Sequence, residues 1–156
     1  MLKNDKHQRG TMMLTFLPEI DEKNTIKQSE RKLKEYQKWL RRFGDVRSQK
    51  ITQTYTFEPR STANPNSSQV EDIVARRDEA ERELEAIEKA VSSIWDSEQR
   101  LLLYKRYMEL GCEKTKDYEI YDFILHISHT AYYDMRDNAL LAFAELYRHG
   151  ILQVEK

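Results

Sequence analysis

Residues 116–143 read KDYEIYDFILHISHTAYYDMRDNALLAF, and the spacing of their apolar residues predicts two helices joined by a tight turn. The first, short helix covers about 117–124, and residues 125–127 form the turn. Ser128 is placed to cap the second helix, which we expect to run to about His149 and to end at Gly150. The positions expected to face inward are Ile120, Phe123, Ile124, Tyr132, Met135, Ala139 and Phe143.

This layout is that of a helix-turn-helix, in which the second helix enters the major groove of B-DNA and meets base edges there. Ser128 would fix the start of the reading helix. His129, Thr130 and Tyr133 would meet bases or nearby phosphates, and Arg136 would meet a phosphate or an internal carboxylate. The alternative is an ordinary helical hairpin in a structural protein.

The charge of this region predicts that it binds DNA only weakly on its own. The segment from Lys114 to Arg148 has four basic and six acidic residues, whereas DNA affinity depends largely on neutralising phosphates. Asp134 and Asp137 on the outward face would repel phosphate, although an aspartate can accept a hydrogen bond from cytosine. Positive charge lies instead in residues 1–60, with 14 Lys and Arg against 8 Asp and Glu.

A helix predicted from about Asp21 to Phe43, ended by Gly44, would carry this charge on one side. One face has an apolar stripe that includes Leu33. The opposite face carries a basic stripe at spacings of three and four, which is Lys23, Lys27, Arg31, Lys34, Lys38 and Arg41. We expect this row to follow the DNA backbone. The alternatives are a solvated helix face, or pairing with the acidic helix predicted further along the chain.

The middle of the chain contains two segments whose residue patterns differ from that of the basic helix. Residues 50–58 alternate like a strand and predict a short extended strap, followed by a Pro- and Asn-containing linker. Ser68 and Glu71 then fit a capping box that opens a helix. Apolar residues recur in heptads over 73–94, interrupted by Arg77. This seam could pack within the chain against the basic helix, or between chains in a homodimer.

The sequence excludes several classes of protein. Its 156 residues contain no HExxH, CxxC, GxSxG or glycine-rich phosphate loop, so we expect no enzyme and no cofactor. His126 and His129 straddle a turn without further ligands, so we expect no metal. The single cysteine, Cys112, fits a reducing cytoplasm. No apolar run reaches membrane-spanning length, and the N-terminus does not read as a signal peptide.

Several segments together resemble the ArpU family of phage-encoded transcriptional regulators, over nearly the whole chain. They are FLPEID (16–21), YTFEPRS (55–61), WDSEQRLLLYKRY (95–107), DYEIYDFILHIS (117–128), HTAYYDMRDNALLAFAELY (129–147) and HGIL (149–152). The resemblance implies a regulator of late phage genes, including lysis functions, acting in the bacterial cytoplasm at the nucleoid. It also implies that the C-terminal half is similar to the promoter-reading fourth region of sigma factors. The family's turn glycine is absent, and His126 stands near its place.

These observations predict an all-α protein in three parts. Residues 1–60 form an arm, the basic helix and the strap; residues 61–95 form the linker and heptad helix; and residues 96–156 form the sigma-like helix-turn-helix lobe. The expected function is sequence-specific binding of double-stranded DNA to regulate transcription. One alternative is an adaptor that binds RNA polymerase without reading DNA. Another is a DNA-packaging recognition subunit.

Overall fold

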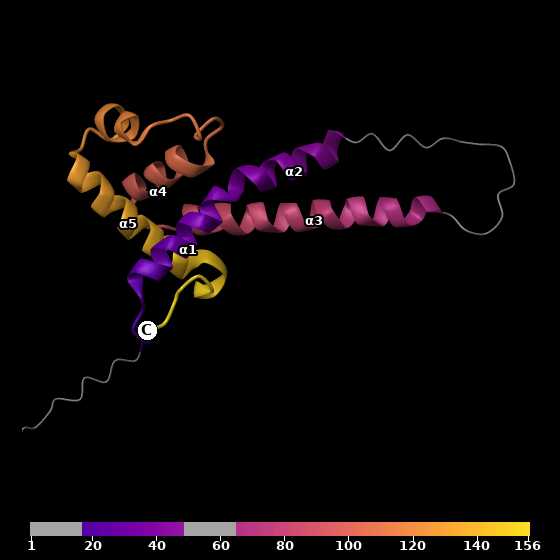
Figure 1. Ribbon diagram of the computed structural model, residues 1–156, viewed down its shortest axis with the longest axis horizontal. Coiled ribbons are helices and arrows are strands. Elements are labelled where there is room, and N and C mark those ends of the chain that lie inside the picture. The colour runs from indigo at the N-terminus through magenta and orange to yellow at the C-terminus, as the bar shows by residue number, and fades with distance from the viewer. Residues whose placement is uncertain (1–16, 49–64) are drawn as a thin grey trace, which may run out of the picture.

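A computed structural model describes residues 17–48 and 65–156, and every named element in these two ranges is helical, as predicted (Figure 1). The predicted strap at 50–58 lies outside the described residues. Within them, no helix is long and apolar enough to cross a membrane. The elements are α1 (Glu22–Lys34), α2 (Tyr36–Ser48), α3 (Pro65–Ser92), α4 (Ser97–Leu103), η1 (Tyr104–Met108), η2 (Glu119–Ile124), α5 (His129–Leu146) and η3 (Tyr147–Gly150).

The helices form two parts, an elongated part made of α1, α2 and α3, called the arm from here on, and a lobe (Figure 1). α1 and α2 follow one another in nearly one direction, and α3 returns alongside α2. α4, η1, η2 and α5 make the lobe, with α5 packed against α1 and α4. One core cluster joins the two parts. It includes Leu33 and Tyr36 from the first two helices, Ile87 from α3, and Tyr132 and Phe143 from α5.

The predicted basic helix is two helices in succession. It begins as expected, because the Asp21 carboxylate accepts the backbone N–H of Asn24 at 3.2 Å. The prediction of one continuous helix is wrong at Glu35, whose carbonyl accepts from both Lys38 and Trp39 as α2 starts. The prediction that Gly44 ends the helix is also wrong, since α2 continues to Ser48. A glycine inside a helix costs about 1 kcal/mol relative to alanine and does not by itself end it.

α3 begins three residues before the predicted capping box, so Ser68 lies inside the helix. Pro65 explains the earlier start, because proline fits the first position of a helix, where its missing N–H is not needed. From Ala80 onward the predicted inner positions Leu84, Ile87, Val91 and Ile94 are buried within this chain. Arg77 is exposed, and its guanidinium lies 5.8 Å from the centre of the Phe43 ring.

A partly buried carboxylate joins the arm to the C-terminus. Glu83 of α3 accepts from Lys32 Nζ at 2.8 Å and from the Tyr147 hydroxyl at 2.9 Å, and it pairs with Arg148. Burial would raise the pKa of Glu83, but these hydrogen bonds and positive charges outweigh it and lower the pKa. The tail continues from there to the start of α1, where Asp21 N–H donates to the Val154 carbonyl at 2.7 Å.

Two elements of the lobe are π-helical turns. In η1 the Glu109 N–H donates to the Tyr104 carbonyl, and at the end of η2 the Leu125 N–H donates to Ile120, each five residues back. The wider turn changes which residues share a face. Ile120 is fully buried as predicted, but Phe123 is 70% exposed, so its assignment to the inner face is wrong.

The two phenylalanines predicted to face inward therefore provide a test of the packing. Phe143→Asp places a charge in the core, where Phe143 is 0% exposed, and should lower the free energy of unfolding by about 3 kcal/mol or more. Phe123→Asp is the matched control and should change it by less than about 0.5 kcal/mol. Thermal unfolding followed by circular dichroism measures both. Equal losses would mean that η2 packs as an ordinary α-helix.

Candidate nucleic-acid interface

The start of α5 is the segment that the sequence predicts to be a reading helix. The Ser128 hydroxyl accepts the Ala131 N–H at 3.2 Å, which confirms the predicted cap. The turn before it is closed by the Ile127 N–H donating to the Tyr121 carbonyl at 2.9 Å. His126 has φ of 54°, in the left-handed region that favours glycine. The residue that stands near the place of a turn glycine therefore takes a glycine-like conformation.

Three of the predicted reading residues pack on one another along α5. The His129 and Tyr133 rings lie 4.7 Å apart, and the Arg136 guanidinium lies 4.8 Å from the centre of the Tyr133 ring. A fourth residue, Tyr121 of η2, places its ring 5.6 Å from the ring of His129. Arg136 also binds the carboxylate of its neighbour Asp137 at 3.1 Å, the internal partner that was one of its two predicted contacts.

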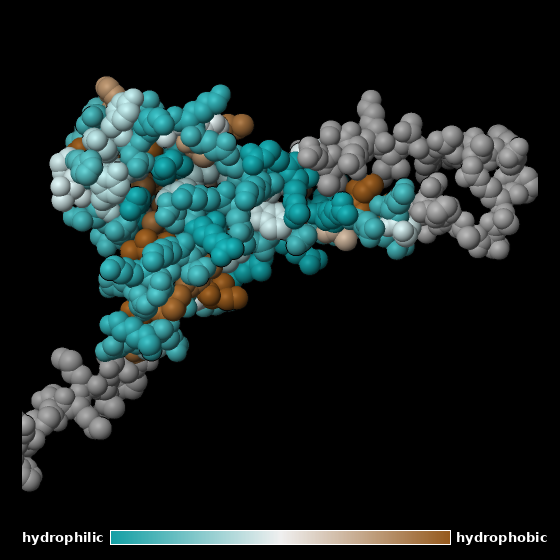
Figure 2. Space-filling model, in the orientation of Figure 1, coloured by the Kyte–Doolittle hydropathy of each residue, from teal (hydrophilic) through white to brown (hydrophobic). Residues whose placement is uncertain are grey.

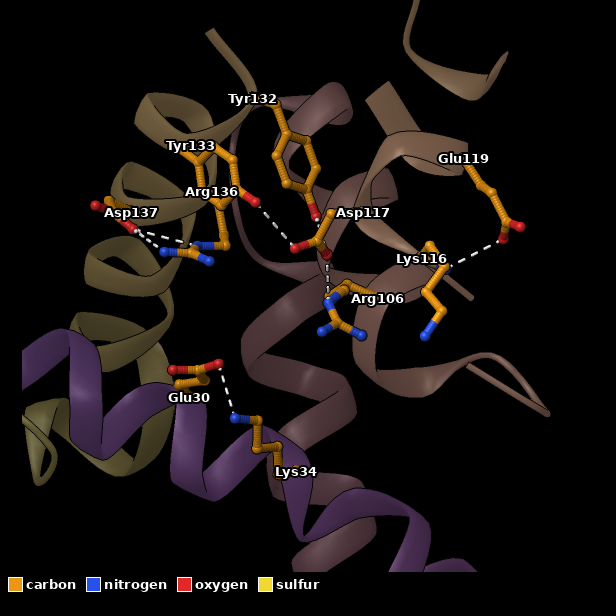
Figure 3. A network of polar contacts seen from close by, with 10 residues as sticks. All are labelled: Glu30, Lys34, Arg106, Lys116, Asp117, Glu119, Tyr132, Tyr133, Arg136 and Asp137. Atoms are coloured by element: carbon orange, nitrogen blue, oxygen red, sulfur yellow. Dashed lines mark hydrogen bonds and ion pairs between the residues drawn. The ribbon is translucent and has the colours of Figure 1, made fainter. Parts of the chain in front are cut away.

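Asp117 is the residue that sequence reasoning missed. Its carboxylate accepts from the Tyr132 hydroxyl at 3.1 Å and from the Tyr133 hydroxyl at 3.2 Å, and it pairs with Arg106 Nε at 2.8 Å (Figure 3). Burial, together with the negative charge of Asp117, raises the pKa of both tyrosines. These contacts join η1 and the residues just before η2 to the first turns of α5. They span up to 16 residues, so no local pattern could have shown them.

The remaining outward residues are open to solvent. Thr130 and Asp134 are exposed, as is His129 on its outer side. The described part of the chain has no group of three or more His, Cys, Asp or Glu side chains that could hold a metal ion. Cys112 is buried beside Gln37, 3.6 Å from its amide nitrogen, so it is a packing residue. The exposed start of α5 thus offers imidazole and hydroxyl groups for hydrogen bonding.

All six members of the basic stripe are exposed on the outer side of α1 and α2. Lys34 binds Glu30 at 2.9 Å, and Arg41 lies 3.6 Å from Glu113. The others form no ion pair with any residue that the structure describes. The stripe borders an open groove of about 440 Å³ lined by Lys27, Glu30, Arg31, Lys34, Glu35 and Lys38. Figure 2 shows a mostly hydrophilic surface in the orientation of Figure 1, with apolar side chains gathered in a few patches.

The basic stripe and the exposed start of α5 belong to helices that contact each other. α1 packs against α5, and Figure 3 shows the Glu30–Lys34 pair of α1 next to the Arg136–Asp137 pair of α5. Lys34, Arg136 and Arg106 are each paired with an acidic side chain at this junction, and the pairing neutralises their positive charge. Net positive charge therefore lies along the rest of the stripe, away from the start of α5.

Comparison with known proteins finds one relative over nearly the whole chain. "Putative autolysin regulatory protein ArpU" of Streptococcus phage O1205 is 43% identical over 141 residues, which are 90% of this chain and 99% of the relative. No family model matches the chain. No solved structure matches it either.

The left-handed turn residue provides a second test. His126→Gly should raise the free energy of unfolding by about 0.5–1 kcal/mol, because it relieves a left-handed conformation that costs other residues roughly 1–2 kcal/mol. His126→Val should lower it, since a β-branched residue tolerates this conformation poorly. Urea denaturation measures both. A loss of stability on introducing glycine would contradict this backbone geometry.

Proposed function

Because the chain belongs to the ArpU family of phage proteins, we propose that it is a DNA-binding regulator of phage late or lysis genes in the bacterial cytoplasm. The start of α5 reads base sequence, and the basic stripe on α1 and α2 holds the phosphate backbone. The observation that carries this proposal is the tight left-handed turn at His126, followed by the capped, exposed start of α5.

Electrostatics support a division of roles between the two surfaces. Asp117 and Asp137 are paired with Arg106 and Arg136, so the reading end attracts phosphate weakly. Phosphate contacts position a protein on DNA, whereas contacts to base edges give specificity. A charged stripe on α1 and α2 and a nearly neutral start of α5 would separate these two tasks.

The first experiment selects DNA from a random-sequence duplex library with the full-length chain and then footprints the enriched site. We expect a short enriched element, protected at its major-groove edges by the wild type. Enrichment of no element would reject sequence-specific binding.

Removing charge from the stripe tests how the backbone is held. Lys27, Arg31 and Lys38 form no ion pair with other described residues, so their joint replacement by Gln leaves the helix and its packing in place. Each lost phosphate contact should flatten the slope of log affinity against log salt by about 0.9. The triple variant should bind all duplexes more weakly, with unchanged sequence preference.

The matched control removes the same charge from the other side of the arm. Arg76, Arg82 and Lys89 are exposed on α3, and their joint replacement by Gln should leave the salt slope as in the wild type. An equal flattening in both triple variants would mean that net charge, and not the stripe, attracts DNA.

An exposed tryptophan favours a second candidate function. Trp95, between α3 and α4, is 97% exposed, and Leu110 in the lobe is 91% exposed. Such side chains are enriched at protein interfaces, which supports an adaptor that binds RNA polymerase. Co-purification with polymerase that Trp95→Ser abolishes, without enrichment of any DNA element, would select the adaptor.

A further inference from the structure

The Tyr133 hydroxyl is already engaged inside the protein. It donates to Asp117 Oδ2 at 3.2 Å, while the other oxygen of the same carboxylate holds Tyr132 and Arg106 (Figure 3). A base edge would therefore have to displace an internal, charge-assisted hydrogen bond in order to reach this hydroxyl. Tyr133 is poorly placed as a reader of bases, although its position on α5 suggested that role.

The ring of Tyr133 has a different use. It contacts the His129 ring at 4.7 Å, and it supports the Arg136 guanidinium at 4.8 Å. These residues lie four and three positions away from Tyr133, so they stand on the same side of α5. Fixing the angle of the Tyr133 ring thus fixes the surface against which both neighbours rest.

We propose that Asp117 is a positioning residue for base reading, and that it acts through Tyr133 to hold His129 in the orientation that meets a base. This inference rests on the proposed DNA-binding function. Tyr133 is the support, and His129 is the residue that determines specificity. Its imidazole has a donor and an acceptor nitrogen and is exposed at the first position of α5.

Preorganisation is the physical reason for such a device. A side chain that is free in solution loses rotamer freedom when it binds, and this loss weakens the complex. His129 has two aromatic neighbours, Tyr121 at 5.6 Å and Tyr133 at 4.7 Å. Its ring is therefore restrained before DNA arrives. Sequence-independent binding through the stripe does not use this restraint.

The test is a double-mutant cycle on the full chain with Asp117→Asn and Tyr133→Phe. Tyr133→Phe removes one hydroxyl and keeps the ring, and Asp117→Asn removes the charge and keeps the shape. The measured quantity is the ratio of affinities for the selected duplex and for a scrambled duplex of equal length. Each single variant should lower this ratio about tenfold, and the double variant should lower it no further.

Two further variants separate positioning from stability. Tyr118→Phe is the surface control, because its hydroxyl meets only Glu119 at 3.4 Å, and it should leave the ratio unchanged. His129→Ala should lower the ratio at least as much as Tyr133→Phe. Each variant is compared at a temperature at which circular dichroism shows that it is fully folded.

The outcomes distinguish this inference from the function on which it rests. A wild-type protein that prefers no duplex would overturn the proposed function and the inference with it. A wild-type preference that Tyr133→Phe leaves unchanged would overturn only the positioning role. Additive losses in the double variant would mean that Tyr133 reads DNA through its own hydroxyl.

Discussion

The side-chain amide of Gln37 connects the arm to the lobe, and the relative placement of the two candidate DNA surfaces depends on it. Its nitrogen lies 3.0 Å from the Met108 carbonyl and 3.2 Å from those of Tyr107 and Glu109, in a buried setting. Carbonyls at the end of a helical turn lack donors within the helix, and leaving them buried without a partner is costly. Gln37 supplies the donor, so α2 must face the lobe with this residue, which leaves Lys34 and Lys38 facing solvent.

The same principle recurs at the other junctions. Asp117 receives donors from η1 and α5, and Glu83 receives donors from α1 and from two residues of η3. Polar groups that are removed from solvent and partnered in this way favour one arrangement, since any other leaves a charge or a carbonyl without a partner. The arm and the lobe are held by such contacts as well as by the shared core. A rigid duplex could then be met at two places without reordering the protein.

Much of the fold follows from local signals in the sequence. Ser128 caps α5 as predicted, and acidic residues cap two further helices, Asp21 at α1 and Asp96 at α4, where Asp96 accepts from the Glu98 N–H at 2.8 Å. The errors arose where two local rules compete. Gly44 reads as a helix end, yet α2 passes through it, and the capping box at Ser68 competes with Pro65, at which α3 begins. The π-helical turns could not be foreseen, because a pattern with 3.6 residues per turn cannot show hydrogen bonds that skip five residues.

The candidate site also has features that local sequence patterns predict and features that they do not. The exposed stripe and the capped start of α5 could be read from spacing alone, because each lies within one or two successive helices. The internal hydrogen bond of the Tyr133 hydroxyl could not be read from spacing, because the carboxylate that accepts it lies 16 residues earlier, beyond a turn. Outward position on a helix tells which side chains can reach a partner, but not which polar groups are already used inside the protein. In this lobe Asp117 and Asp137 are already paired with Arg106 and Arg136, so that distinction decides which side chains remain free for a partner.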